Sequence, residues 1–452
     1  MSFSFVKRLI AVLIAIISAL ISGGNTPERK TDPVFTGTFL QSWPGAHWDE
    51  ARWKLETDEM KRDGIEYLII QSIADKTKKS DGGKWTLYYD SDLPEFADAD
   101  VGPNFVESAL RACKGTGIKV IVGLTIFEDF WLQAGFTKQY IESCRISASL
   151  AKEIYARYGE EYSDTLFGFY FTPELCNNVL NTASVAQLSK GLNIVLDEMT
   201  TSCGDLPLVM SPYQTNYLTI GTIDTASFWA KIFTRCHFRN GDIIAPQDAV
   251  GANFTEIEDL EKNWKMFRTL VDGADVELKL WANCESFSIA RTKSIISGIA
   301  LPDATENTQN VPAPMSRFAY QLDVASRYCD NIITFSYNHY LSPNQVDHVF
   351  IDAYRKYIAN GFSTEKNAPD APDNFKSVIG NDGAVLTWTS ASDDTGIAYY
   401  RITKNGEFLT RIECMYGEPE LCFTDPSGKS SDKYVITAYD TSGNISEAVT
   451  AK

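Results

Sequence analysis

The sequence lacks the patterns that hold metal ions and those that build repetitive proteins. Its nine cysteines include no Cys-x-x-Cys pair, and its four histidines do not cluster with them, so the spacing typical of zinc sites is missing. The 452 residues contain no long segment of low complexity and no self-similar period, which excludes a solenoid or a collagen-like chain. We therefore expect a globular protein with no metal ion and no other cofactor.

Positively charged residues are also in deficit. The chain has 41 lysines and arginines against 59 acidic residues, and its formal net charge is −18. Such a surface repels polyanions, so we exclude nucleic acid as a partner. Aromatic residues, in contrast, make up 12% of the chain. They fill cores, and exposed Trp and Tyr rings also serve as platforms for sugars. The composition therefore favours a neutral small molecule or glycan as the ligand.

The first residues have the layout of a targeting segment. Lys7 and Arg8 precede an almost unbroken apolar run over 9–21, and small residues follow at 22–24. This run is short for a membrane span, so residues 1–25 are predicted to be a signal peptide. If the segment is retained, it becomes an N-terminal anchor and gives a transient or anchored membrane association. We expect a bacterial protein that is secreted or displayed at the cell surface.

Most of the remaining chain alternates short β-branched apolar runs with amphipathic helical stretches. Such alternation predicts βαβ units and a parallel sheet, and eight strands predict a closed (β/α)8 TIM barrel, placed at 34–362. The predicted strands are Phe35–Leu40, Tyr67–Gln71, Lys119–Leu124, Leu166–Thr172, Pro207–Ser211, Asp242–Ala245, Glu277–Ala282 and Asn331–Ser336. The fold class is therefore α/β, and we expect a monomer.

A linker rich in Pro and Asp, placed at 363–373, separates the barrel from a small all-β domain at 374–452. Asn405-Gly406 between two apolar runs is a strong hairpin signal. The segments around Trp388, Ala398–Ile402 and Tyr434–Asn444 resemble a fibronectin type III module, an immunoglobulin-like sandwich in which Trp388 would be buried. Cys414 and Cys422 flank a turn-rich segment here and could pair. We expect this module to act as a spacer.

The segments that follow the predicted strands carry polar and aromatic side chains. Barrel enzymes bind their ligands at the carboxyl ends of the strands, so these side chains are expected to line one rim. A rim of this kind predicts a cleft for a hydroxylated ligand. The candidate ligand-binding residues are Trp43, His47, Trp48, Gln71, Asp129, Trp131, Asn177, Tyr213, Gln247, Asp248, Trp281, Tyr337 and His339.

Two carboxylates stand out on this rim, Glu174 after the fourth strand and Glu285 after the seventh. Glycoside hydrolysis needs two carboxyl groups that flank the scissile bond. One of them donates a proton to the leaving oxygen, while the other attacks the anomeric carbon or activates water. Across a barrel mouth the two groups could approach to roughly 5–5.5 Å, the spacing of retaining enzymes.

Four longer stretches of the chain carry a resemblance to a known family: GTFLQSW (37–43), MKRDGIEYLIIQ (60–71), GFYFTPEL (168–175) and WANCESF (281–287). They are similar to an uncharacterised bacterial family of glycoside-hydrolase-like barrels, of the domain of unknown function 4434 type. The arrangement of the two glutamates also resembles that of the retaining clan of (β/α)8 glycoside hydrolases. This resemblance implies that Glu174 is the proton donor, with its pKa raised by the charge of Glu285, and that Glu285 is the nucleophile. That clan usually has Asn immediately before its acid/base Glu, where this chain has Pro173, so the contact with the sugar 2-hydroxyl would come from Asn177 or Gln247.

These observations favour an exported glycoside hydrolase that acts on a neutral carbohydrate substrate. Two other hypotheses fit part of the pattern, and a third is disfavoured by it. Pro173 in place of Asn favours a non-catalytic glycan-binding protein that kept the cleft. Glu128, Asp129 and Asp248 could serve a divalent-metal enzyme on the same rim. A purely structural extracellular module would not need so polar a rim.

Overall fold

The computed structural model describes residues 28–128, 138–178, 184–214, 222–290, 294–296, 299–301, 309–417, 419 and 421–452, with no side-chain description for 222–224 and 294–301. The predicted signal segment at 1–25 lies outside these residues, as do Asp129 and Trp131. None of the helices in the described part of the chain is both long enough and apolar enough to span a bilayer.

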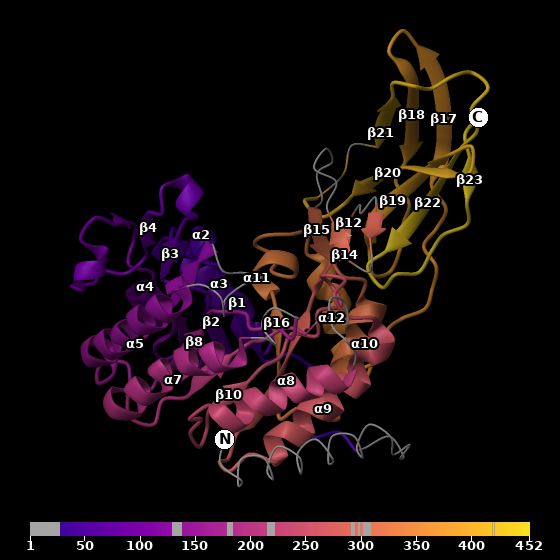
Figure 1. Ribbon diagram of the computed structural model, residues 1–452. Coiled ribbons are helices and arrows are strands. Elements are labelled where there is room, and N and C mark those ends of the chain that lie inside the picture. The colour runs from indigo at the N-terminus through magenta and orange to yellow at the C-terminus, as the bar shows by residue number, and fades with distance from the viewer. Residues whose placement is uncertain are drawn as a thin grey trace. The chain divides into compact units, whose positions relative to one another are not determined.

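Eight parallel strands close a barrel, which confirms the predicted fold class (Figure 1). Around the barrel the strands follow in the order β1, β16, β11, β10, β9, β8, β6 and β2. All eight coincide with predicted strands, but β11 extends to Glu285, three residues beyond its predicted end. The strands are β1 (Gly37–Leu40), β2 (Tyr67–Ile70), β6 (Lys119–Gly123), β8 (Leu166–Phe171), β9 (Leu208–Met210), β10 (Ile243–Ile244), β11 (Lys279–Glu285) and β16 (Asn331–Phe335).

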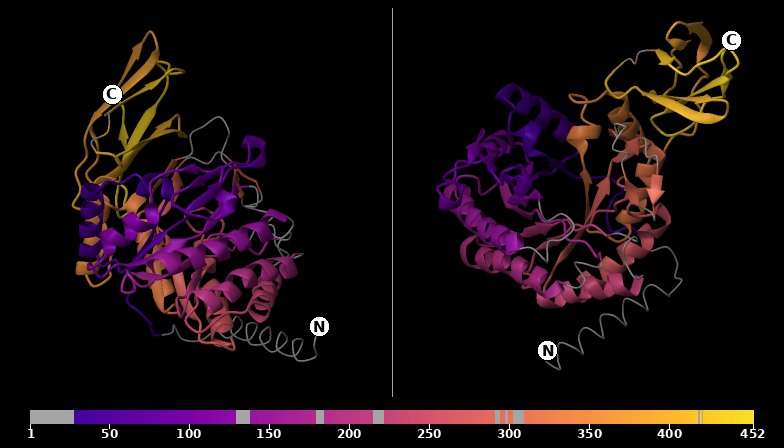
Figure 2. Two further views of the ribbon diagram at one scale, coloured as in Figure 1. Left: turned by 90° about the vertical axis from the view of Figure 1, so that its left-hand side faces the viewer. Right: turned by 45° about the horizontal axis from the view of Figure 1, so that its top comes forward.

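Amphipathic helices lie outside this ring of strands (Figure 2). Polar caps fix where two of them begin, because the side chain of Asp49 accepts from the backbone N–H of Arg52 at 2.8 Å and that of Asn104 accepts from Glu107 at 3.0 Å. The helices are α3 (Glu50–Arg62), α4 (Phe105–Cys113), α5 (Lys138–Tyr158), α7 (Val185–Ser202), α8 (Thr222–Arg235) and α9 (Leu260–Asp272). After β2 the chain forms a small sheet of β3 (Ala74–Lys76), β4 (Trp85–Leu87), β5 (Asp100–Val101) and β7 (Thr125–Phe127).

The barrel interior is filled by a hydrophobic cluster to which every strand contributes. Its members are Phe39, Ile69, Ile121, Tyr170, Val209, Ile243, Ala245, Trp281 and Ile333. Side chains alternate along a strand, so the residue two positions later points to the same side. The polar residues Gln71, Ser211, Gln247 and Asn283 therefore lie one step above this core, toward the mouth of the barrel.

The C-terminal region forms two antiparallel sheets around a core of its own, which confirms the predicted β-sandwich. Trp388 is buried in this core, with its ring 5.6 Å from that of Tyr400. One sheet contains β17 (Asp373–Gly380), β18 (Gly383–Thr389) and β21 (Cys422–Asp425). The other contains β19 (Ile397–Lys404), β20 (Glu407–Glu413), β22 (Tyr434–Asp440) and β23 (Val449–Thr450). The likeness to a fibronectin type III module stays a prediction.

The hairpin predicted in the sandwich is present, whereas the suggested pairing of two cysteines is not. Asn405 and Gly406 connect β19 to β20 with φ values of 53° and 89°, as a type I′ hairpin requires. Cys414 and Cys422 do not pair. No disulfide bond joins them in the structure, in which Cys414 is buried and Cys422 is exposed on β21.

By its internal contacts the chain divides into two compact units. The first comprises Met1–Glu285, Ile289–Gln309 and Gln321–Ser336, and the second Ser286–Ser288, Asn310–Tyr320 and Tyr337–Lys452. The second unit thus holds α11 (Tyr337–Tyr340) and α12 (Val349–Ala359) together with the sandwich, while α10 (Met315–Ser326) starts in it and ends in the first unit. The domain limits predicted at 362 and 374 stay a prediction.

Within the second unit, a turn of the sandwich caps the start of α10. The carbonyls of Thr441 and Ser442 accept from the backbone N–H groups of Met315 and Ser316 at 2.8 and 3.1 Å. These are N–H groups that a helix cannot satisfy by itself. The contact is close, because a Cβ at Gly443 would lie 3.0 Å from both Pro314 Cβ and Ser316 Oγ.

Gly443→Ala is therefore expected to loosen the start of α10. Its φ of +96° already costs an alanine about 1–2 kcal/mol, and the contacts with Pro314 and Ser316 add about 1 kcal/mol or more. Gly406→Ala is the matched control, because Gly406 has a φ of +89° with nothing within 4 Å of its added Cβ. Hydrogen exchange at the Met315 and Ser316 amides checks this, and equal exchange in both variants would contradict it.

Candidate active site at the mouth of the barrel

The two predicted glutamates lie at the carboxyl ends of β8 and β11. Glu285 is the last residue of β11, and Glu174 follows the end of β8 at Phe171 by three residues. In the barrel order β9 and β10 separate these strands, so the glutamates come from well-separated sides of the mouth. Trp281, Asn283 and Glu285 occupy alternate positions of β11, and Trp281 is in the interior cluster. Glu285 therefore lies on the inner face of the barrel.

Glu285 is held firmly. Its side chain is 3% exposed, and Oε2 accepts from the backbone N–H of Ala252 at 2.7 Å. Its own N–H donates to Asp248 Oδ1 at 3.3 Å, and its carbonyl accepts from Gln321 Nε2 at 3.2 Å. A backbone N–H that points at a carboxylate stabilises the negative charge.

Glu174 is in a different environment. It is partly buried, and burial raises its pKa to about 7, while a hydrogen bond with Gln247 acts in the opposite direction. The raised pKa agrees with the prediction, but the predicted cause was wrong, because burial and not the charge of Glu285 raises it. A carboxyl group with this pKa carries its proton for a large part of the time at neutral pH.

Amide and hydroxyl side chains form a layer at the ends of β9, β10 and β11, beside the two glutamates. Gln247 and Asn283 form a parallel β-bridge that continues the pairing of β10 with β11. Both side chains reach Ser211, where Gln247 Nε2 donates to the carbonyl at 3.2 Å and Asn283 Nδ2 to Oγ at 3.0 Å. Gln247 also contacts Glu174, which supports its predicted place at the site. Asn283 and Ser211 were not predicted, although extending the alternation of Trp281 to Glu285 would have found Asn283.

Two polar residues that were predicted to bind the ligand have other partners in the protein. Asp248 is 3% exposed and accepts from Gln321 Nε2 at 2.5 Å, so it belongs to the framework. Asn177 is also buried, and its Nδ2 donates to Thr225 Oγ1 at 2.8 Å, which removes it as a replacement for the clan's Asn.

The correction for Trp281 is larger. It is the third residue of β11, and its ring lies 4.8 Å from that of Tyr67, the first residue of β2. Trp281 therefore fills the amino end of the barrel and does not reach the rim.

Other aromatic candidates are exposed to different degrees. Trp43 is 62% exposed, and its Nε1 donates to Gln41 Oε1 at 2.9 Å, so its ring is available as a platform. Trp48 packs edge-on against Trp53 at 5.0 Å. His47 is exposed, and its ring lies 6.4 Å from that of Tyr88. The predicted set is completed by the partly buried Gln71, the buried Tyr213, and Tyr337 and His339 in the second unit. Burial lowers the pKa of His339 to about 4.

The two tryptophans Trp43 and Trp281 provide a direct check of these placements. Trp281→Ala is expected to lower the free energy of unfolding by about 3–5 kcal/mol, because it leaves a cavity inside the barrel. Trp43→Ala removes an exposed ring and is expected to change stability by about 0.5 kcal/mol or less. Denaturant unfolding of both variants measures the difference. Similar losses would show that Trp281 does not fill the core.

The structure adds a third carboxyl group to the rim, that of Asp75. Asp75 accepts from Ser72 Oγ at 2.5 Å and from Ser42 Oγ at 3.4 Å, just beyond the ends of β1 and β2. Burial raises the pKa of Asp75, against the effect of these hydroxyls. The sequence signal was available, since Asp75 opens the polar segment after the second strand.

Carboxylates that could share a cation occur elsewhere. Among the residues that the structure describes, those of Glu365, Asp393 and Asp394 in the second unit are close enough to do so. Glu128 and Asp248, two of the three residues of the metal-enzyme hypothesis, are not in such a group. Glu128 accepts from the backbone N–H of Lys78 at 3.3 Å.

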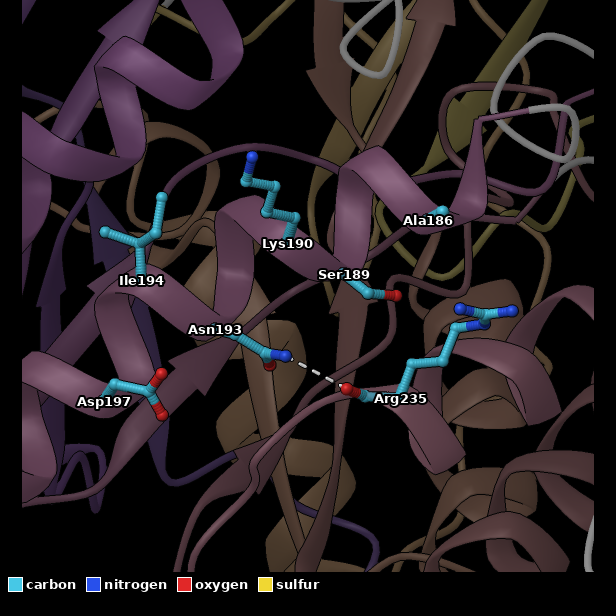
Figure 3. Close-up of a pocket in the computed structure, with 7 residues that line it drawn as sticks. All are labelled: Ala186, Ser189, Lys190, Asn193, Ile194, Asp197 and Arg235. Atoms are coloured by element: carbon cyan, nitrogen blue, oxygen red, sulfur yellow. Dashed lines mark hydrogen bonds between the residues drawn. The ribbon is translucent and has the colours of Figure 1, made fainter. Parts of the chain in front are cut away.

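A hollow on the outer side of the barrel is lined by side chains that stabilise the fold. It lies between α7 and the end of α8 (Figure 3). Asn193 Nδ2 donates to the carbonyl of Arg235 at 3.0 Å, and its Oδ1 accepts from the N–H of His237 at 2.9 Å. Asp197 pairs with the His237 ring at 2.8 Å. These side chains fasten two helices together, and we assign the hollow no ligand.

The geometry agrees with a match to a known protein family. Residues 35–347 match the family described as Domain of unknown function (DUF4434), which is more than half of the chain. The chain belongs to the DUF4434 family. The matched residues contain both glutamates and all eight barrel strands.

Two further similarities concern this DUF4434 chain. A crystallised protein of Bacteroides thetaiotaomicron VPI-5482, assigned provisionally as an alpha-L-fucosidase, is 20% identical with a TM-score of 0.54, and the match covers 76% of this chain and 100% of that one. At this identity the likeness shows the fold. A gellan lyase of Bacillus sp is 34% identical over 152 residues, which are 32% of this chain but only 6% of that protein.

Proposed function

We propose that this DUF4434 protein is a retaining glycoside hydrolase that cleaves a glycosidic bond in a neutral glycan. The observation that carries the proposal is the contrast between two carboxyl groups at one barrel mouth. Burial raises the pKa of Glu174 to about 7, whereas Glu285 accepts a backbone N–H at 2.7 Å. Two carboxyl groups in such different environments can act as acid and as nucleophile at the same pH.

The reaction follows from these environments. Glu174 donates its proton to the glycosidic oxygen while Glu285 attacks the anomeric carbon, so the bond to the leaving group breaks as the glycosyl–enzyme bond forms. Water then attacks the anomeric carbon, Glu174 takes up a proton from it, and Glu285 leaves as a carboxylate. In this proposal Gln247, which contacts Glu174, binds a sugar hydroxyl, and the exposed ring of Trp43 stacks on a sugar.

Three further observations support a carbohydrate ligand. The alpha-L-fucosidase and gellan lyase matches both name proteins that act on carbohydrates. The net charge of −18 disfavours polyanionic ligands.

We also propose that the protein is exported by its N-terminal segment. An enzyme that acts on polymeric glycans would meet them outside the cell.

A screen of neutral polysaccharides and aryl glycosides tests the proposal. The wild-type protein is expected to release sugar from at least one of them in the presence of a chelator, and the double variant Glu174→Gln/Glu285→Gln is not. Retention of a glycan without release of product would instead support the non-catalytic binding protein that Pro173 favours. Loss of activity in the chelator would support the metal enzyme.

A further inference from the structure

A buried side chain from α10 reaches the backbone of Glu285. Gln321 is completely buried, and its Nε2 donates both to Asp248 Oδ2 at 2.5 Å and to the carbonyl of Glu285 at 3.2 Å. One amide group thus connects a helix, the segment after β10 and the last residue of β11. No short-range pattern in the sequence marks Gln321, because its partners are 36 and 73 residues away.

Asp248 completes the arrangement on the other side of the same residue. Its Oδ1 accepts from the N–H of Glu285 at 3.3 Å and from that of Val250 at 3.2 Å. Its own N–H donates to the carbonyl of Asn283 at 2.9 Å. The backbone N–H and carbonyl of Glu285 are therefore both held, one by Asp248 and the other by Gln321.

The segment that contains Asp248 also holds the carboxylate of Glu285, which is the reacting group. The segment from Asp248 to Ala252 brings the backbone nitrogen of Ala252 to 2.7 Å from Glu285 Oε2. A shift of Asp248 would displace both the backbone of Glu285 and the donor to its carboxylate. Displacing a reacting group by about 1 Å is enough to slow a reaction by about 10²-fold.

We propose that Gln321 and Asp248 are positioning residues that set the Glu285 carboxylate for attack. The proposal rests on the proposed function for its kinetic consequence, but its structural consequence can be measured without a substrate. Gln321 acts through Asp248 and through the backbone of Glu285, and Asp248 acts through its hydrogen bond to the N–H of Glu285.

Gln321→Leu in the full chain removes both donated hydrogen bonds. The amides of Ala252 and Glu285 are expected to exchange with solvent at least about tenfold faster, since each donates to a carboxylate whose support is lost. With a substrate that the wild type cleaves, kcat is expected to fall by about 10²-fold with little change in KM. Unchanged exchange at both amides would overturn the proposal.

Asn193→Leu is the matched control. Asn193 is also a side-chain amide in the first unit that holds backbone through two hydrogen bonds, to Arg235 and His237. This variant is expected to leave exchange at Ala252 and Glu285 and the value of kcat at wild-type levels. If it accelerates exchange there as much as Gln321→Leu does, the effect is general destabilisation and the proposal fails.

Gln321→Glu adds a readout that loss of stability alone would not produce. A glutamate at this position faces the carboxylate of Asp248, so it can donate a hydrogen bond only when protonated. Protection of the Ala252 and Glu285 amides, corrected for intrinsic exchange, is expected to be weak at pH 8 and to recover toward pH 5. Equal protection at both pH values would contradict the role of Gln321 as the donor.

The outcomes separate this proposal from the proposed function. Normal hydrolysis by Glu174→Gln and Glu285→Gln would overturn the proposed function whatever the exchange data show. Faster exchange in Gln321→Leu with unchanged kcat would keep the hydrogen-bond network but refute its part in positioning the reacting carboxylate.

Discussion

Glu174→Gln is expected to slow hydrolysis of an unactivated glycoside by about 10²–10⁴-fold, the usual contribution of a general acid. The amide keeps the shape of the side chain but cannot donate an acidic proton to the leaving oxygen. Aryl glycosides with good leaving groups need less protonation, so the first step on them is expected to be much less affected. The comparison of the two substrate types by steady-state kinetics checks this prediction.

The pH dependence of the hydrolysis rate provides a control for the role of Glu174 as the acid. The group must be protonated to act as the acid, and burial raises its pKa to about 7. The wild-type rate is therefore expected to fall as the pH rises through about 7, and this alkaline limb should be absent from Glu174→Gln. If the limb persists in the variant, another group titrates and Glu174 is not the acid.

Glu285→Ala is expected to abolish the reaction, with a loss on the order of 10⁴–10⁶-fold, as removal of the nucleophile does in other covalent hydrolases. No glycosyl–enzyme bond can form without this carboxylate. A small anion such as azide fits the space left by the side chain and is expected to attack an aryl glycoside, giving a glycosyl azide of inverted configuration. NMR of the anomeric proton identifies this product.

The stereochemistry of the wild-type reaction decides the role of Glu285. Retention of configuration in the first product seen by NMR is expected for a nucleophile. Inversion would instead make Glu285 a general base for water, and full activity of Glu285→Ala would remove it from the reaction. Folding of the variant is checked by exchange at amides far from the site, such as that of His237, which donates to Asn193.

The strands of the barrel were predictable because their signal is local. Runs such as Tyr67–Ile70 and Leu166–Phe171 are apolar and bounded by polar or turn-forming residues, so neighbouring residues suffice to recognise them. The identity of the two glutamates followed from the same reasoning, since each lies within three residues of the predicted end of such a run.

The end of β11 could not be read in this way. Asn283 and Glu285 interrupt its apolar run, yet Asn283, Cys284 and Glu285 pair with Ile333, Thr334 and Phe335 of β16. Pairing with a distant strand therefore extends β11 past its sequence signal. Trp281 was misplaced for the same reason, because ending the strand at Ala282 puts it near the rim.

The sequence by itself determined the closed barrel, the C-terminal β-sandwich and the two strand ends at which Glu174 and Glu285 lie. Only the tertiary structure decided that Glu174 is buried enough for a pKa of about 7 and that Asp248 and Gln321 hold Glu285. Strand and helix periodicity depends on residues close in the chain, whereas burial and these hydrogen bonds depend on segments that meet only in the folded protein.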